Sequence, residues 1–301
     1  MNLPKEIPQS HFLAYILKGS RARNLQTANS DHDYCGIFIG SLNFYFGNAK
    51  KDSYVANTYG NDVIFYELRK FINLLAAANP NCLELLWTEP KHFLHTTDIF
   101  QEIVRNRNLF VSKQIYKTFN HYALQQIHRM TSCTKPVIEE YEQLENILIA
   151  EGLNISELSP KQSVRDKIVC GKKLDTYIQR YIQMSKQYFT AGGRLGIRRK
   201  QVIKAYGYDT KNCSVLTMLM RQAIELLETG ELQVTRTDRD SLLSIKDGKY
   251  SLEEIKQIIE DLFDKAAQAV VVSKLSDDVD REKIEALCVK LISDFYKIPQ
   301  D

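Results

Sequence analysis

The stretch Lys18–Gly40, KGSRARNLQTANSDHDYCGIFIG, decides how the first part of the chain folds and what it binds. It contains the pair Gly19-Ser20 and, about ten residues later, two aspartates separated by one residue, Asp31 and Asp33. Side chains alternate along a strand, so both aspartates would project from one face. Two carboxylates this close repel each other unless a cation lies between them. The spacing therefore indicates either a metal site or a polar turn.

A phosphate-binding role explains both halves of this stretch. Gly19 has no Cβ, so the backbone can approach a ligand closely there. The Ser20 hydroxyl and the N–H groups of the turn after it can donate to phosphate oxygens. Asp31 and Asp33 supply the hard oxygen ligands that Mg²⁺ or Mn²⁺ prefers, so a nucleoside triphosphate would be held for in-line attack. Taken alone, however, such a motif is more often a helix cap or a polar turn.

Length and composition limit the class of protein that could carry this site. The chain has 301 residues, of which 44% are hydrophobic and 26% charged, and this is long enough for a packed core and suggests two domains. A net charge of +3 permits a phosphate-bearing partner without requiring one. Six scattered cysteines argue for a reducing compartment without structural zinc or disulfides. No signal peptide or membrane-spanning run is evident, so we expect a soluble, cytoplasmic protein.

The first hundred residues mix strand and helix signals. Apolar runs rich in β-branched and aromatic residues predict strands over 11–17, 33–40 and 62–66. Apolar residues at helical spacing predict a helix over 67–79, and Pro80 starts the next one. Strands connected through helices in this order predict a small mixed sheet.

From residue 98 onward the pattern is helical. A helix over 251–269 opens with a capping box made by Ser251 and Glu254. We therefore predict an α+β protein, with a small mixed-sheet domain over 1–97 and a larger helical domain over 98–301. The second domain contains a variable insertion at about 131–195.

The wider pattern resembles nucleotidyltransferases of the DNA polymerase beta superfamily. It is most similar to the predicted bacterial and phage branch, which includes the RNA-ligase-associated RNA repair nucleotidyltransferases. That branch shows Gly-Ser-Arg-Ala, then Ser-Asp-x-Asp, a glycine and an apolar strand. The matching residues are Gly19, Ser20, Arg21, Ala22, Ser30, Asp31, Asp33 and Gly36. Similarity continues into DVIFYELRKFINLLAAANPNCLELLW, FVSKQIYKTF, GYDTKN, ELLETGEL and LLSIKDGKYSLEE, so it covers most of the chain, and 131–195 matches least.

The resemblance implies a third carboxylate on a neighbouring strand, and two residues qualify. Asp62 begins the third predicted strand and Glu67 ends it, and their odd separation puts them on opposite faces. Only one can therefore face Asp31 and Asp33. We favour Asp62, because Glu67 is also explained as a favourable charge in the first turn of its helix.

Other basic and polar residues are candidates for phosphate contacts. Ser112 and Lys113 begin a helix in a segment that the resemblance also marks, although a solvated helix start explains them equally well. Arg21 and Arg23 lie beside the Gly-Ser turn; one of them would neutralise the leaving pyrophosphate while the other faces solvent, and we take Arg21 as the candidate. The basic run over 192–204 follows two glycines and fits a nucleic-acid backbone or nucleotide phosphates. Its candidate residues are Arg198, Arg199 and Lys200.

One departure from the family pattern bears on the acceptor. Relatives often have a histidine and then an arginine after GYDTKN, where this chain has Val215 and Met218. The resemblance thus implies a magnesium- or manganese-dependent enzyme that uses a nucleoside triphosphate, with an RNA end as the favoured acceptor. A nucleotide- or nucleic-acid-binding regulator that has lost catalysis is the alternative.

Overall fold

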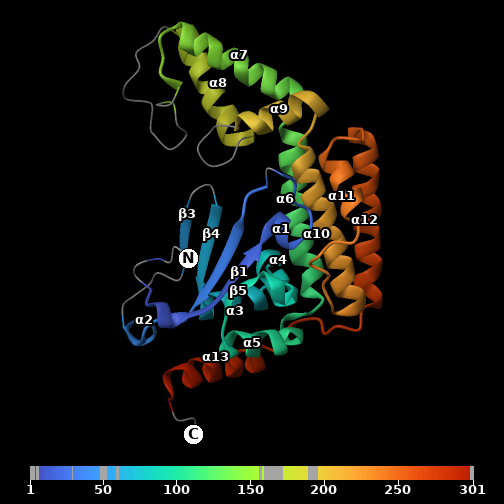
Figure 1. Ribbon diagram of the computed structural model, residues 1–301. Coiled ribbons are helices and arrows are strands. Elements are labelled where there is room, and N and C mark those ends of the chain that lie inside the picture. The colour runs from blue at the N-terminus through green and yellow to red at the C-terminus, as the bar shows by residue number, and fades with distance from the viewer. Residues whose placement is uncertain are drawn as a thin grey trace. The chain divides into compact units, whose positions relative to one another are not determined.

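The structure is a computed structural model that describes residues 4, 7–28, 30–47, 53–58, 61–155, 158, 172–188 and 196–298 (Figure 1). The chain forms two compact units. The sheet unit comprises Met1–His121, Leu219–Ser241 and Asp261–Asp301, and the helical unit comprises Tyr122–Met218 and Leu242–Glu260. Residues far apart in the sequence thus build each unit. The predicted boundary after residue 97 stays a prediction.

The sheet unit contains a five-stranded mixed sheet with the order β3-β4-β2-β1-β5. Strands β2 and β4 are parallel, and the other neighbours are antiparallel. The predicted strands at 11–17, 33–40 and 62–66 are confirmed as β1, β2 and β4, whereas β3 and β5 were not predicted. The strands are β1 Phe12–Lys18, β2 Asp33–Phe38, β3 Ser53–Thr58, β4 Asn61–Glu67 and β5 Phe93–Thr96.

Helices account for most of the remaining described residues, which confirms the predicted α+β class. The longer helices are α3 Leu68–Ala76, α5 Asp98–Arg105, α6 Gln114–Ser132, α7 Lys135–Ala150, α8 Lys172–Tyr188, α9 Ile197–Tyr206, α10 Thr210–Thr229, α11 Arg239–Lys246, α12 Leu252–Val272 and α13 Arg281–Tyr296. The short ones are α1 Gly19–Ala22, α2 Leu42–Phe46, α4 Pro80–Leu83, η1 Gln9–His11, η2 Glu84–Trp87, η3 Pro90–His92 and η4 Arg107–Phe110. No helix among the described residues is long and apolar enough to cross a membrane.

Local sequence explains where several helices begin. Asn79 caps α4, and Pro80 occupies its first turn, as predicted. Ser251 and Glu254 form the expected capping box, with each backbone N–H donating to the other side chain. These local rules hold because the groups involved lie within one turn of each other.

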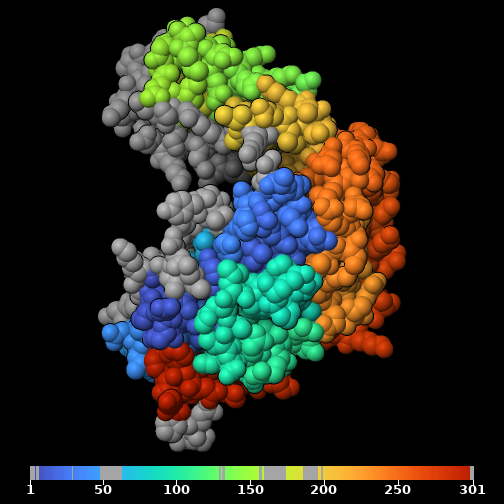
Figure 2. Space-filling model, in the orientation of Figure 1, coloured from blue at the N-terminus to red at the C-terminus, as the bar shows by residue number. Residues whose placement is uncertain are grey.

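The core of the sheet unit lies between the sheet and helices α3 and α5 (Figure 1). On α3, Phe71 and Leu75 are fully buried, as their helical spacing predicts. The C-terminal helix α13 packs against α3 and α5, and its Tyr296 hydroxyl donates to the Gly40 carbonyl at 2.5 Å. Figure 2 shows α13, in red, against the blue N-terminal segments of the same unit. The Tyr296 contact lies near the start of β1, because Phe12 at that start pairs with Phe38 at the end of β2.

The helical unit has its own core between α7, α8 and α9. Tyr141 and Tyr181 stack with ring centroids 4.7 Å apart, and the Tyr141 hydroxyl donates to that of Tyr181 at 2.8 Å. Both rings are buried. Burial of large side chains of this kind typically stabilises a fold by about 1.5–3 kcal/mol each.

Candidate active site

Gly19 and Asp33 lie in direct contact at the end of the sheet. Lys18, the last residue of β1, is the cross-strand partner of Asp33 at the start of β2. Gly19 follows with φ of +71°, a left-handed conformation that glycine tolerates best. A Cβ at Gly19 would lie only 2.3 Å from Oδ2 of Asp33. The Asp33 carboxylate therefore occupies space that only a glycine leaves open.

Arg21 fixes the loop that carries Asp31. Its Nη2 donates to the Ser30 carbonyl at 2.9 Å, and its Nε donates to the Asp31 carbonyl at 3.3 Å. The guanidinium thus holds the Ser30–Asp31 backbone close to α1. The predicted contact between Arg21 and pyrophosphate stays a prediction.

The side chains of four polar residues around this turn have no hydrogen bond or ion pair with any residue that the structure describes. The Asp31 side chain is exposed, and the other three residues are half-buried. The nearby Arg23 differs, because its guanidinium pairs with Glu84 at 2.8 Å. Charges taken partly out of water are costly unless a partner is supplied. We call this set the open turn: Lys18, Ser20, Asp31 and Asp33.

Strand register separates the two candidates for the third carboxylate. In the parallel pair of β2 and β4, Tyr34 lies beside Val63. One residue earlier on each strand, Asp62 comes beside Asp33. The backbone of Asp62 lies in β4, whereas its side chain is outside the described residues.

Glu67 lies at the other end of β4, beside Phe38. Its carboxylate is buried and accepts hydrogen bonds from the Tyr45 hydroxyl at 2.6 Å and from the Arg69 and Lys70 N–H groups at 2.9 and 3.3 Å. It therefore caps α3. Burial raises the pKa of Glu67, and the hydrogen bonds from Tyr45 and Lys70 partly oppose this increase.

The donor set of the open turn fits a hard divalent cation. Mg²⁺ and Mn²⁺ prefer carboxylate oxygens, and the close approach at Gly19 leaves room for the Asp33 carboxylate. Among the described side chains, no group of three His, Cys, Asp or Glu residues gathers as a metal site. The predicted roles of Asp31, Asp33 and Asp62 as metal ligands stay a prediction.

A segment far along the chain holds α1 from its other end. Thr235 Oγ1 donates to the Ala22 carbonyl at 3.5 Å, the Arg236 N–H donates to the Arg23 carbonyl at 3.0 Å, and Arg239 Nε donates to the Asn24 carbonyl at 2.8 Å. These acceptors are the carbonyls that a helix leaves without partners at its C-terminal end. A helix of four residues is not stable by itself. Residues 235–239 therefore stabilise the turn that begins at Gly19.

Arg236 anchors this segment and was not predicted. Its side chain is 3% exposed and pairs with Glu225 and Asp238, each at 2.8 Å. Arg221 also pairs with Asp238, at 2.6 Å. Burial alone would raise the pKa of Asp238, but the hydrogen bonds from Arg236 and Arg221 outweigh it and lower that pKa. The only local signal for this cluster is the density of charge in TRTDRD, residues 235–240.

The structure gives Ser112 and Lys113 contacts away from the open turn. Ser112 is fully buried, and its hydroxyl accepts from the Gln114 N–H at 3.3 Å. The Lys113 N–H donates to the Ser276 carbonyl at 2.8 Å, and its ammonium pairs with Asp277 at 3.1 Å. Their predicted role at a triphosphate stays a prediction.

The described cations of the basic run are paired within the helical unit. Arg199 pairs with Asp209 at 2.8 Å, and Lys200 pairs with Glu145 at 3.1 Å. The Lys200 ammonium also lies 5.0 Å from the centre of the Tyr141 ring. The side chain of Arg198 is outside the described residues. Arg199 and Lys200 thus stabilise packing around α9.

The positions that depart from the family pattern lie on α10. Met218 is buried, and Val215 is half-buried. The polar residues just before them make structural bonds, since Thr210 Oγ1 donates to the Lys246 carbonyl at 2.7 Å and Ser214 Oγ donates to the Leu242 carbonyl at 2.9 Å. These two hydroxyl groups therefore bond the start of α10 to backbone carbonyls of α11.

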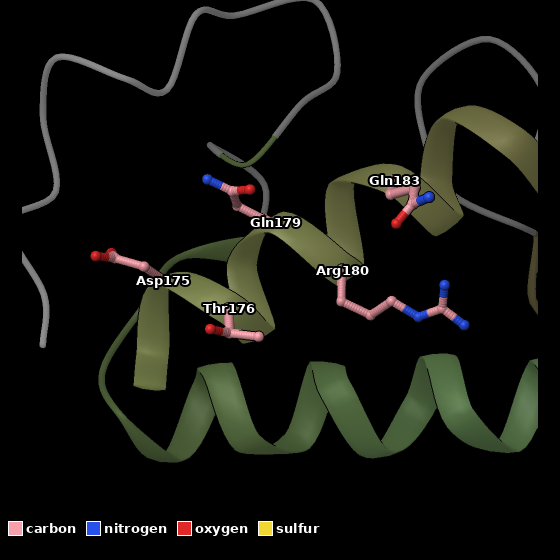
Figure 3. A pocket seen from close by; sticks show the side chains of 5 residues that line it. All are labelled: Asp175, Thr176, Gln179, Arg180 and Gln183. Carbon is pink, nitrogen blue, oxygen red and sulfur yellow. The ribbon is translucent and has the colours of Figure 1, made fainter. Parts of the chain in front are cut away.

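A hollow on α8 lies in the helical unit and contains none of the predicted site residues. Arg180 donates to Glu140 of α7 at 2.8 Å, and Figure 3 shows it extended along that helix. The described lining residues all come from α8, so among them no groups from different elements converge. They are Asp175, Thr176, Gln179, Arg180 and Gln183.

The mixed sheet thus carries a Gly-Ser turn in contact with the Asp33 carboxylate, and Asp31 lies two residues before Asp33. Residues 9–145 match the model of a family described as the RNA repair pathway DNA polymerase beta family. This match confirms the resemblance over residues 9–145, which include the whole open turn. No curated protein and no solved structure matches the chain.

Proposed function

We propose that the sheet unit transfers a nucleoside monophosphate from a nucleoside triphosphate to a hydroxyl group and releases pyrophosphate. The observation that carries this proposal is the Asp33 carboxylate held against Gly19, with Asp31 two residues earlier and neither side chain paired with a described residue. The match to an RNA repair family supports an RNA end as the acceptor.

The reaction exchanges one phosphoester bond for another. The acceptor oxygen forms a bond to the α-phosphorus, while the bond from that phosphorus to the oxygen bridging to the β-phosphate breaks. Pyrophosphate takes the electron pair of the broken bond, and the acceptor hydroxyl loses its proton. An in-line arrangement of attacking and leaving oxygens is required, so positioning and charge stabilisation supply most of the catalysis.

Three aspartates would hold the metal. Asp31, Asp33 and Asp62 would supply its oxygen ligands, and the bound Mg²⁺ or Mn²⁺ would neutralise phosphate charge and acidify the acceptor hydroxyl. The strand position of Asp62 beside Asp33 supports it as the third carboxylate and as the group that helps to remove the proton. Glu67 is the weaker candidate, because its carboxylate already caps α3.

Label transfer tests this proposal. The chain is incubated with each α-labelled nucleoside triphosphate, Mg²⁺ or Mn²⁺, and RNA, DNA and protein acceptors. We expect label on RNA with the wild type and none with Asp31→Ala/Asp33→Ala. Asp264→Ala, which changes an exposed aspartate of α12, serves as the matched control and should transfer label normally. Nucleotide binding that needs both aspartates, without transfer to any acceptor, would instead support the regulator.

A further inference from the structure

Lys18 shares one face of the sheet with Asp33. The two residues are direct partners in the antiparallel pair of β1 and β2. Side chains of such partners project to the same side, with Cβ atoms about 4.5–5.5 Å apart. Lys18 is also the residue immediately before Gly19-Ser20. It therefore lies beside Asp33 and directly before the turn that the proposed function assigns to the triphosphate.

The Lys18 ammonium has no partner in the part of the chain that the structure describes. The side chain is half-buried, and no ion pair joins it to Asp33 despite their pairing. By contrast, half-buried Arg23, five residues later, is fully engaged by Glu84. A lysine that is partly removed from water beside an aspartate, yet unpaired, is available for another anion.

The positive charge of Lys18 affects the pKa values of two buried thiols. Burial raises the pKa of the Cys35 thiol to about 12, and the Lys18 ammonium opposes this increase. Burial also raises the pKa of the Cys82 thiol on α4, and the Lys18 ammonium opposes this increase as well. The strand register agrees with this, because Lys18 pairs with Asp33 and Ile16 pairs with Cys35, so Lys18, Asp33 and Cys35 share one face of the sheet.

We infer that Lys18 binds a phosphate oxygen of the nucleoside triphosphate beside Asp33. This inference rests on the proposed function and adds a residue that the family motif does not include. Lysine is a compact point charge suited to a phosphate oxygen, and charge-assisted bonds are the stronger class. Lys18 also repels any cation held by Asp33, so it has opposite effects on the metal and on the phosphate.

Because Lys18 should weaken metal binding and strengthen phosphate binding, measuring both affinities tests the inference. Binding to the full chain is measured for Mn²⁺ alone, for inorganic tripolyphosphate, for each nucleoside triphosphate, and for RNA with and without a 5′-phosphate. Lys18→Gln removes the charge, Lys18→Arg keeps it, and Lys265→Gln removes an exposed lysine of α12 as the matched control. Thermal unfolding of each variant verifies that it is folded.

We expect Lys18→Gln to weaken tripolyphosphate and nucleoside triphosphate binding about tenfold, as loss of one charge-assisted bond implies. The same variant should bind Mn²⁺ about threefold more tightly, because a nearby like charge is gone. Lys18→Arg should keep most of the phosphate affinity, and Lys265→Gln should change neither affinity.

Three results would overturn the inference while leaving the proposed function in place. Equal losses of Mn²⁺ and phosphate affinity would make Lys18 structural. Tighter Mn²⁺ binding with unchanged tripolyphosphate binding would show that Lys18 only balances Asp33. A loss confined to 5′-phosphorylated RNA would assign Lys18 to the acceptor. If the wild type bound neither tripolyphosphate nor any nucleoside triphosphate, the proposed function would fail and the inference with it.

Discussion

The open turn and helix α9 both combine charge with neighbouring glycines, and the sequence predicts phosphate binding at each. On α9 every described cation has a carboxylate partner, whereas the charges of the open turn have none among the described residues. Charge density alone therefore does not distinguish the two regions, whereas the pairing of their charges does. The α9 pairs are Arg199 with Asp209, Lys200 with Glu145 and Lys204 with Glu142.

The largest difference should appear when the carboxylates of the open turn are neutralised. Asp31→Asn/Asp33→Asn should lower Mn²⁺ affinity by about a hundredfold or more, because two charged ligands are lost. The free energy of unfolding should stay within about 0.5 kcal/mol of the wild type, since neither carboxylate loses a partner among the described residues. Titration of free Mn²⁺ by electron paramagnetic resonance and chemical unfolding measure the two effects. A large loss of stability would instead show that the carboxylates are structural.

The paired cluster of the sheet unit should respond in the opposite way. Arg236→Met should lower the free energy of unfolding by about 3–5 kcal/mol, because it leaves Glu225 and Asp238 without their buried partner. Arg105→Met breaks only an exposed pair with Glu102 and should cost less than about 1 kcal/mol. Urea unfolding compares the two variants. Similar costs would mean that the Arg236 cluster does not anchor the turn.

A methyl group at Gly19 should damage both the fold and the metal site. Gly19→Ala should cost about 1–2 kcal/mol for its positive φ and should also displace the Asp33 carboxylate. Gly230→Ala is the control, because Gly230 has φ of +73° but no atom closer than 3.9 Å to the added Cβ. We therefore expect both variants to lose stability and only Gly19→Ala to lose Mn²⁺ binding. Retained Mn²⁺ affinity in Gly19→Ala would place the metal elsewhere.

Neutralising a cation of α9 should lower the stability of the fold without changing phosphate affinity. Lys200→Gln should leave tripolyphosphate binding unchanged and lower stability by about 1–2 kcal/mol, because its charge forms a largely buried pair within the helical unit. Isothermal titration beside Lys18→Gln provides the comparison. If Lys200→Gln weakens tripolyphosphate binding as much as Lys18→Gln does, pairing is not the property that separates the two regions.

The smallest effect should be the acid sensitivity of the paired cluster. Folding lowers the pKa of Asp238 below its ordinary value of 3.8. Its contribution to stability is therefore present above that value and is lost as the pH falls below it. Between about pH 5 and pH 3, the wild type should lose more stability than Asp238→Asn, which has no such carboxyl to protonate. Parallel unfolding curves over this range would contradict the lowered pKa.

Local sequence rules predicted the elements whose causes are local. Strands β1, β2 and β4 and helices α3 and α12 follow from apolar periodicity and caps within a few residues. Strand β3 was missed because SYVANT, at 53–58, is short and half polar. Strand β5, at 93–96, was missed because its pairing partner is β1, about eighty residues earlier.

The candidate site was predictable only in part, for the same reason. The contact between Gly19 and Asp33 follows from a strand–turn–strand pattern that is visible in one stretch. The choice between Asp62 and Glu67 depends on the parallel register of β2 and β4, which no local pattern contains. The support of α1 by Arg236 is a contact between residues more than two hundred positions apart.

Iron-directed cleavage of the backbone tests most directly that the open turn is the metal site. Fe²⁺ replaces Mg²⁺ in the full chain, ascorbate and peroxide generate radicals at the bound ion, and mass spectrometry maps the breaks. The account predicts breaks near Lys18–Ser20 and Asp31–Asp33 that excess Mg²⁺ suppresses and that Asp31→Asn/Asp33→Asn abolishes. Breaks confined to the α9 segment or scattered along the chain, unaffected by that double variant, would contradict it.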